Sequence, residues 1–434
     1  MNKRILKIAL PAIATNITIP LLSLVDLAIA GHLGDKSFIC AISVGGTLIN
    51  MLYWTFGFLR MSTSGLTAQA FGAQDSPAIA NILPRSIVIS LLACLLIFLL
   101  KTPIQHLSFN YMGLTPDVAQ SAAYYFSICI LGAPAVMTLY SIKGWLIGMQ
   151  NSLYPMIIAI SINVINIICS FLFVYGFNWG LTGIVLGTLF SQHCGLLLAL
   201  LLWKHKYSGL IPLIDKKQIF NANKFKHFTK INGGIAIRTL CLTAVTTFFT
   251  LAGAKQGTTL LAVNTLLIQL FSIFSYFTDG FAYAGEALCG RYLGAKDFTN
   301  LNKTIRYLFI WGWSLVLVFT IAYIFFTQEF LHLLTNDNTI IEASAEYHIW
   351  VIAIPICGFS AFLWDGIMVG TTMVKGMVTA MICATLLFFS LYNILIDTIQ
   401  NNGLWIAFLC YLSTRGIVQA IYFKLKMAAN RLDD

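Results

Sequence analysis

Long apolar segments separated by short polar turns follow one another along the whole chain. Each is at least 18 residues long, enough at about 1.5 Å per residue for an α-helix to cross the hydrocarbon core of a bilayer. The pattern predicts twelve transmembrane helices, at residues 6–30, 38–70, 84–101, 119–149, 155–176, 181–203, 231–253, 259–293, 306–327, 343–372, 374–397 and 402–423. We therefore expect an all-α integral membrane protein.

The predicted helices form two halves related by an internal repeat. The sequence GAQD at 72–75 recurs as GAKD at 294–297, an offset of 222, and Gly31, Gly144 and Gly148 are each followed by a glycine at that offset. Six helices in each half give both halves the same orientation, a parallel repeat typical of transporters with a central site between two lobes. We expect an N-lobe at 1–203, a linker loop at 204–230 and a C-lobe at 231–434.

Composition supports a lipid environment and changes the interpretation of the charge. With 58% hydrophobic and 10% charged residues, the chain has too little polar surface for a soluble globule of 434 residues. A net charge of +10 is common in nucleic-acid-binding proteins, but here seven lysines lie in the 204–230 loop, whereas only Lys36, Lys101 and Lys255 fall outside the cytoplasmic segments and the spans. This distribution predicts cytoplasmic termini, a linker against anionic lipid headgroups and no nucleic-acid partner.

Several classes of function lack their motifs here. The ten cysteines lie in apolar spans without a CxxC pair, and the seven histidines show no HExxH spacing, so we expect no disulfide framework, metal site or cofactor. The chain has no nucleotide-binding motif, and its cytoplasmic loops offer only lysines for catalysis. A transporter driven by an ion gradient is favoured over an ATP-driven pump, a membrane enzyme or a channel.

Three segments carry a resemblance to a known family. They are LVDLAIAGHL at 24–33, FLRMSTSGLTAQAFG at 58–72 and DGFAYAGE at 279–286. The chain resembles the multidrug and toxic compound extrusion (MATE) family, and within it the bacterial DNA-damage-inducible (DinF) branch. The resemblance implies a V-shaped pair of six-helix lobes, cation-coupled antiport and export of amphipathic, often cationic compounds.

Asp26 is the first of four carboxylates inside predicted spans, where a charge is expensive. Pro11 and Pro20 share its helix, and because proline removes a backbone donor, helix 1 is a candidate for two interconvertible bends. A low dielectric disfavours the charged form, so such a carboxyl group can exchange protons near neutral pH. The resemblance implies a coupling role for Asp26, and Pro11 matches a kink proline of the family's helix 1. The alternative is a carboxylate that only caps a local hydrogen-bond network.

Helix 5 carries polar side chains at i, i+3 and i+7, which place Asn163, Asn166 and Ser170 on one face. This resembles the family's Asn-x-x-x-Asp pattern, with Ser170 where an aspartate is often found. We expect Asp26 with Asn163 and Asn166 to form the N-lobe cation site. Interhelical amide contacts are the alternative.

Two oppositely charged residues occupy equivalent positions of the repeat. Asp365 of helix 10 aligns with a cation-site aspartate of other MATE branches, and 222 positions before it lies Lys143. One hypothesis is an ion pair that breaks or protonates during the transport cycle. A fixed salt bridge, or charges that face separate lobes, are the alternatives.

Helix 8 carries Asp279 and Glu286 two turns apart on one face, with Tyr283 between them. We expect this stripe to handle substrate or protons, or to pair with Arg238 of helix 7. Arg60, in the most family-like motif, is expected to contact a carboxylate or backbone carbonyls.

Aromatic side chains near the charged positions complete the candidate set. Tyr53, Tyr283 and Trp364 are candidates for lining a substrate cavity, together with Arg60. Packing between helices or against lipid is the alternative for each.

Together these patterns predict a non-enzymatic, monomeric, multi-pass exporter in the bacterial cytoplasmic membrane, coupled to H+. Na+ coupling is a first alternative. A flippase for lipid-linked precursors, from the same wider superfamily, is a second.

Overall fold

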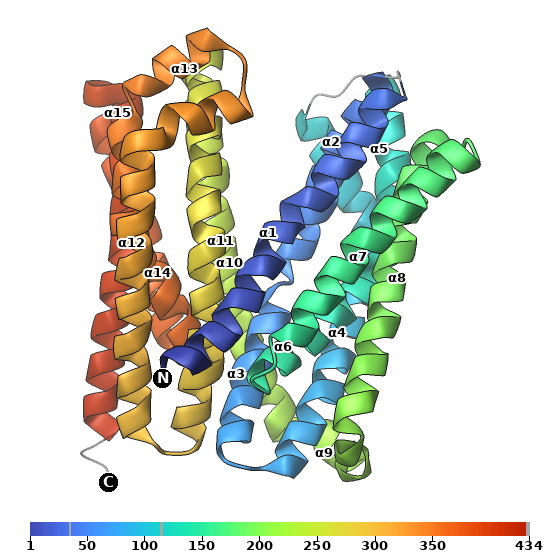
Figure 1. The fold of residues 1–434 in the computed structure, drawn as a ribbon, viewed down its shortest axis with the longest axis vertical. Coiled ribbons are helices and arrows are strands. Elements are labelled where there is room, and N and C mark those ends of the chain that lie inside the picture. Colours follow the sequence, from blue (N-terminus) through green and yellow to red (C-terminus); the bar gives the residue numbers. More distant parts are fainter. Residues whose placement is uncertain (34–35, 113–115, 431–434) are drawn as a thin grey trace. The chain divides into compact units, whose positions relative to one another are not determined.

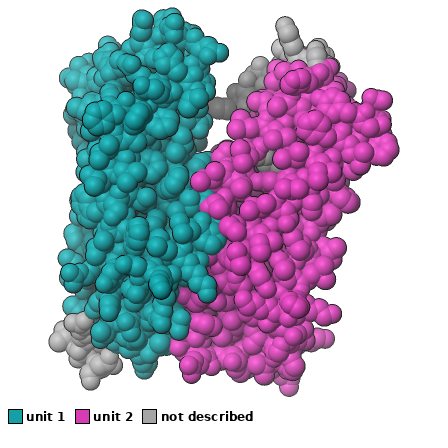
Figure 2. Space-filling model, viewed as in Figure 1, with its two compact units in different colours: residues 1–13, 230–434 teal, residues 14–229 magenta. Residues whose placement is uncertain are grey.

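The computed structural model describes residues 1–33, 36–112 and 116–430, in which every regular element is a helix (Figure 1). Contacts divide the chain into two compact units (Figure 2). Unit 1 comprises residues 1–13 and 230–434, and unit 2 comprises residues 14–229. The expected all-α fold is confirmed.

The helices follow one another with short connections. Unit 2 contains most of α1 (Asn2–His32), then α2 (Lys36–Thr55), α3 (Phe58–Gly72), α4 (Ser76–Met112), α5 (Pro116–Cys129), η1 (Ile130–Gly132), α6 (Ala133–Gly148), α7 (Leu153–Phe171), the π-helical η2 (Leu172–Gly176), α8 (Gly180–Tyr207), η3 (Ser208–Leu213) and α9 (Lys216–Ile219). Unit 1 contains most of α10 (Ala222–Lys255), then α11 (Thr258–Gly294), α12 (Phe298–Leu334), α13 (Asn338–Ala345), α14 (His348–Gly370) and α15 (Val374–Asn430).

Ten helical stretches of the described chain are long and apolar enough to cross a membrane, and α15 is counted once among them. Its 57 residues would extend about 85 Å if straight. Gln400 leaves the helical conformation at φ 46° and ψ −123°, and a Cβ on Gly403 would lie 2.9 Å from the Cβ of Leu395. The chain therefore folds back, and α15 supplies two spans. With the 31-residue α1 added, the prediction of twelve helices is confirmed.

The repeat is visible in the contacts between helices. In unit 2, a Cβ on Gly144 of α6 would lie 2.3 Å from the carbonyl oxygen of Arg60 in α3. In unit 1, 222 residues later, a Cβ on Gly366 would lie 2.2 Å from the carbonyl oxygen of Ala282. Left-handed backbone conformations recur at the same offset, at Gln74 and Lys296, Gln150 and Thr372, and Asn178 and Gln400. Adding 222 therefore identifies equivalent positions of the two units.

The two compact units differ from the predicted lobes in where two segments belong. The start of α1 packs in unit 1, where Arg4 Nη1 donates a hydrogen bond of 2.6 Å to the hydroxyl of Tyr292. The greater part of the linker, residues 204–229, packs in unit 2. The boundary between the units thus lies inside α1, between Pro11 and Pro20.

Candidate functional site

A buried polar cluster connects three helices of unit 2. Asn166 Nδ2 of α7 donates to Thr188 Oγ1 of α8 at 2.9 Å, and that hydroxyl donates to Asp26 Oδ2 of α1 at 3.1 Å. Asp26, Asn166 and Thr188 are 4%, 0% and 8% exposed. The Thr188 hydroxyl also lies 3.3 Å from the carbonyl oxygen of Ile184, so its single proton is donated either to that carbonyl or to Asp26, the nearer acceptor. The cluster therefore links the protonation state of Asp26 to α7 and α8.

Three oxygens of this region are left without a hydrogen bond to any described residue. They are Asp26 Oδ1, Asn166 Oδ1 and Ser170 Oγ, all buried. Ser170 lies where α7 approaches α8, since a Cβ on Gly187 would come within 2.4 Å of its hydroxyl oxygen. A buried oxygen without a partner is costly, and such atoms mark sites where a proton or another donor is bound.

Asn163 contacts α1 at a different point. Its Nδ2 donates to the backbone carbonyl of Thr18 at 2.8 Å, two residues before Pro20. The helix-5 face predicted from spacing thus meets α1 twice, at Thr18 and through Thr188 at Asp26. Both contacts lie on the unit-2 part of α1, and α1 is continuous through both of its prolines.

A charged cluster occupies the interior of unit 1. Arg238 Nη2 of α10 and Arg415 Nη2 of α15 both donate to Asp365 Oδ2 of α14, at 2.5 and 2.6 Å. Gln419 Nε2, one turn beyond Arg415, donates to Asp365 Oδ1 at 2.6 Å. Asp365, Arg415 and Gln419 are 4%, 1% and 0% exposed. Such pairs fix helices strongly once formed, because either partner alone would be a buried charge.

Arg238 thus pairs with Asp365, and its pairing with the α11 carboxylates stays a prediction. Lys143 lies on α6 in unit 2 and Asp365 on α14 in unit 1, so their pairing stays a prediction. Both oxygens of Asp365 already accept hydrogen bonds from unit-1 side chains.

The predicted polar stripe lies on α11 in unit 1, and Arg60 lies in unit 2. Glu286 is 1% exposed, whereas Asp279 and Tyr283 are partly exposed on the same helix face. Arg60 lies on α3, with its backbone against Gly144. Their roles in substrate or proton handling stay predictions.

Two of the candidate aromatic side chains are used in helix packing. The hydroxyl of Tyr53 donates to the carbonyl of Cys129 at 2.8 Å. Trp364 packs on Phe309 and Phe423, with ring centroids 5.5 and 5.2 Å away. Both residues are 6% exposed, so in this structure they join helices.

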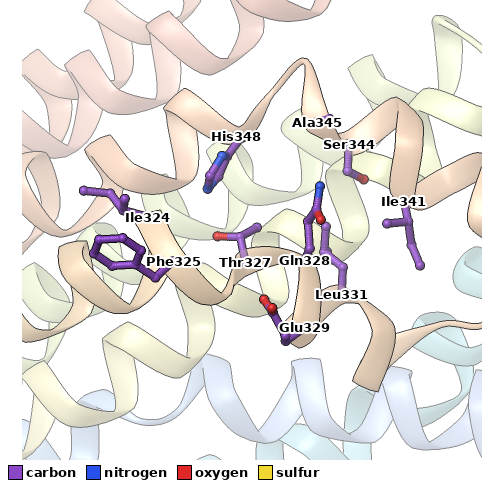
Figure 3. A pocket seen from close by; sticks show the side chains of 10 residues that line it. All are labelled: Ile324, Phe325, Thr327, Gln328, Glu329, Leu331, Ile341, Ser344, Ala345 and His348. Atoms are coloured by element: carbon purple, nitrogen blue, oxygen red, sulfur yellow. The ribbon is translucent and has the colours of Figure 1, made fainter.

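A cavity of about 230 Å³ lies in unit 1 beside the last turns of α12, where α13 and the first residue of α14 cover it (Figure 3). His348 contributes to its lining, and its Nε2 bonds the carbonyl of Tyr323 at 2.7 Å. Asp365 lies 17 residues further along α14, about 25 Å away. The cavity is therefore separate from the charged cluster.

Sequence reasoning missed Thr188, Arg415 and Gln419 as site residues. Thr188 is one of many hydroxyl residues in the spans, and its role depends on α8 packing beside α1 and α7. A stronger signal existed for the other two: Arg415 is a cation inside a span, and Gln419 follows it by one helical turn.

Comparison with known proteins gives consistent matches. The model of the MatE family matches residues 11–172 and 235–394. DNA damage-inducible protein F of Escherichia coli (strain K12) is 33% identical over 425 residues, which cover 98% of this chain and 92% of that protein. Multidrug and toxin extrusion protein 1 of Homo sapiens is 24% identical over 366 residues, 79% of this chain and 60% of that protein. A crystal structure of MATE in the bent conformation superposes with a TM-score of 0.87 at 18% identity, covering 100% of this chain and 96% of the other.

Proposed function

This chain belongs to the MatE family of membrane transporters, and from that premise we propose that it exports small organic compounds by alternating access in exchange for protons. The family resemblance seen in the three sequence motifs, including the DinF branch, is confirmed. Family membership also agrees with a transport role rather than an enzymatic one.

The observation that carries the coupling proposal is the buried hydrogen-bond chain from Asn166 through Thr188 to Asp26. A charged Asp26 only accepts hydrogen bonds, whereas a protonated one also donates. A proton at Asp26 Oδ1 would need an acceptor, and Asn166 Oδ1 is a buried carbonyl oxygen with none of its capacity used. Protonation thus changes which contacts between α1, α7 and α8 are favourable, as a coupling ion must do.

Protons are favoured over Na+ by the number of carboxylates available. The N-lobe cluster holds one, because Ser170 stands where a second would lie. In unit 1, the two guanidinium groups already neutralise Asp365. A Na+ site would have to rely on Asp26 with neutral oxygens, whereas a proton needs one carboxyl group and one acceptor.

The finer features of the proposal follow from charge placement. We place both termini and the lysine-rich 204–230 segment on the cytoplasmic side of a bacterial inner membrane, because lysines are retained there. Carboxylates inside the spans favour amphipathic cations as substrates. We propose that one chain is sufficient and that H+ is the coupling ion, with no organic cofactor.

Transport by the purified full chain tests the coupling. A fluorescent cationic dye is followed in proteoliposomes under an imposed pH gradient and, separately, a Na+ gradient. We expect the pH gradient to drive dye movement in the wild type and in Asp397→Asn, an exposed carboxyl of α15. Asp26→Asn should abolish it.

Two outcomes would refute parts of this proposal. If only the Na+ gradient drives dye movement, the coupling ion is Na+ and not H+. If neither gradient moves dye while the same vesicles translocate a lipid-linked substrate, the chain is a flippase.

A further inference from the structure

A second cavity lies in unit 2 between α3, α4 and the first turns of α10. Its volume is about 400 Å³, within the range of small-ligand sites. Leu66 and Ile82 contribute apolar wall, and Arg85, Lys224 and His227 contribute nitrogen groups. The cavity is therefore amphipathic, with a basic side.

Arg85 is positioned as a fixed cation in this cavity. It is 5% exposed, and its Nε and Nη2 donate to the backbone carbonyls of Ile219 and Gln218, at 3.1 and 2.6 Å. Its Nη1 makes no hydrogen bond to any residue that the structure describes. A guanidinium held along one edge in this way presents its remaining donors in a defined direction.

The lining adds a second cation beside it. Lys224 Nζ donates to Gln218 Oε1 at 2.7 Å, so the lysine and the arginine both lie against the same linker residue. The acidic member of the lining, Asp75, accepts from the backbone N–H of Ala78 at 2.9 Å, at the start of α4. The cavity thus holds two cations and a histidine against one carboxylate that is used to cap a helix.

The position of the cavity along α4 is at the edge of the lipid-facing surface. Leu91, Leu92 and Leu95 are 49%, 54% and 55% exposed, and they begin six residues after Arg85, about 9 Å along the helix. Large exposed leucines on a membrane helix face lipid tails. Arg85 therefore lies at the level of headgroups.

We propose that this cavity binds the phosphate group of an anionic phospholipid, with Arg85 and Lys224 as its donors and the apolar wall against the glycerol region. Basic pockets between helix ends are suited to such headgroups. The bound lipid would join α4 to the start of α10, the helix that leads out of unit 2. This proposal is independent of the transported substrate and of the coupling ion.

Lipid retention by the full-length protein tests it. The protein is reconstituted in nanodiscs of phosphatidylcholine doped with phosphatidylglycerol, extracted in neutral detergent, washed at about 1 M salt and assayed for retained lipid by mass spectrometry. At that salt the Debye length is about 3 Å, so loosely attracted lipid is removed. We expect the wild type to retain phosphatidylglycerol over phosphatidylcholine.

Two lysines of α10 supply a matched pair of variants. Lys224→Gln should reduce retained phosphatidylglycerol about fivefold, whereas Lys226→Gln, which loses the same charge outside the lining, should retain it. Lys224→Arg should restore retention. Thermal unfolding of each variant verifies that the fold is intact.

Three results would overturn the proposal. Equal loss in Lys224→Gln and Lys226→Gln would mean that general attraction to the linker, and no specific cavity, holds the lipid. Equal retention of the two lipids by the wild type would exclude an anionic headgroup. Full displacement by millimolar inorganic phosphate would make the ligand a free anion.

Discussion

The two units share a backbone but hold their buried polar groups at different positions of the repeat. The unit-2 cluster of Asp26, Asn166 and Thr188 has hydrophobic or weakly polar equivalents in unit 1, at Phe248, Phe388 and Cys410. The rings of Phe248 and Phe388 meet edge to face, with centroids 6.0 Å apart. Where unit 2 has a buried chain of hydrogen bonds, unit 1 has an aromatic contact.

The reverse comparison gives the same result. Arg238, Asp365 and Arg415 of unit 1 are equivalent to Asn16, Lys143 and His193 of unit 2. Lys143 keeps a charge of the opposite sign, and the two arginines become neutral or titratable side chains. The repeat therefore preserved the glycine contacts that set helix packing, while the chemistry of each unit diverged.

Two of the buried carboxyl groups, Asp26 and Asp365, therefore have partners of different chemistry. Asp365 is held by two cations and an amide, an arrangement that stabilises helix packing only while it is complete. Asp26 is held by a hydroxyl, and the hydrogen bonds of its cluster come from Thr188 and Asn166, which carry no charge. A group that must change protonation is better served by neutral partners.

The largest expected difference is in stability. Asp365→Asn removes the carboxylate that pairs with the buried Arg415 and the half-buried Arg238, and should lower the free energy of unfolding by about 3–5 kcal/mol. Asp26→Asn keeps an oxygen for the Thr188 hydroxyl and should cost less than about 1 kcal/mol. Thermal unfolding in detergent measures both. Equal losses would contradict the division of roles.

A smaller effect is expected from a change in the hydrogen-bond chain of unit 2. Thr188→Val keeps the shape of the side chain but removes the hydroxyl between Asn166 and Asp26. Losing these one or two hydrogen bonds, about 1 kcal/mol each, should slow pH-driven dye export about five- to tenfold. Cys410→Val, at the equivalent position of unit 1, is the control and should transport normally. An unchanged rate in Thr188→Val would remove the hydroxyl from the coupling path.

A change at Phe388, the unit-1 equivalent of Asn166, should affect stability without affecting proton coupling. Phe388→Leu removes an edge-to-face contact with Phe248 and should lower the free energy of unfolding by about 1 kcal/mol. The pH dependence of dye export should stay that of the wild type. A shifted pH profile in this variant would show that unit 1 takes part in proton coupling.

The smallest effect on stability is expected at Asp297, in the repeated GAKD segment at 294–297. Asn300 donates side-chain and backbone hydrogen bonds to Asp297, which lowers the pKa of that carboxyl from its ordinary value of 3.8. A lowered pKa in the folded state gives stability that is present above pH 4 and is lost as the pH falls below it. Unfolding midpoints between pH 5 and pH 3 should therefore fall slightly less in Asp297→Asn than in the wild type. A steeper fall in the variant would contradict the assignment.

Sequence patterns predicted the spans and the repeat because both depend on short-range periodicity and on glycine positions. They also placed Asn166 on the face that reaches Asp26. They did not predict that Asp365 pairs with Arg238 and Arg415, since helix periodicity gives the face of a residue but not the neighbour of its helix. For the same reason, the sequence left open whether Tyr53 and Trp364 line a cavity or pack between helices, and the structure shows packing.

The placement of residues 1–13 in unit 1 has a consequence for the order in which the protein is made. Chains are synthesised from the N-terminus, but the bond from Arg4 to Tyr292 joins residues 288 positions apart. The start of α1 must therefore wait in the bilayer until α11 has been inserted. Unit 2 can assemble early, whereas its first helix is secured only when the second half of the chain arrives. A truncated product that ends at the linker would lack the binding surface for its own N-terminus.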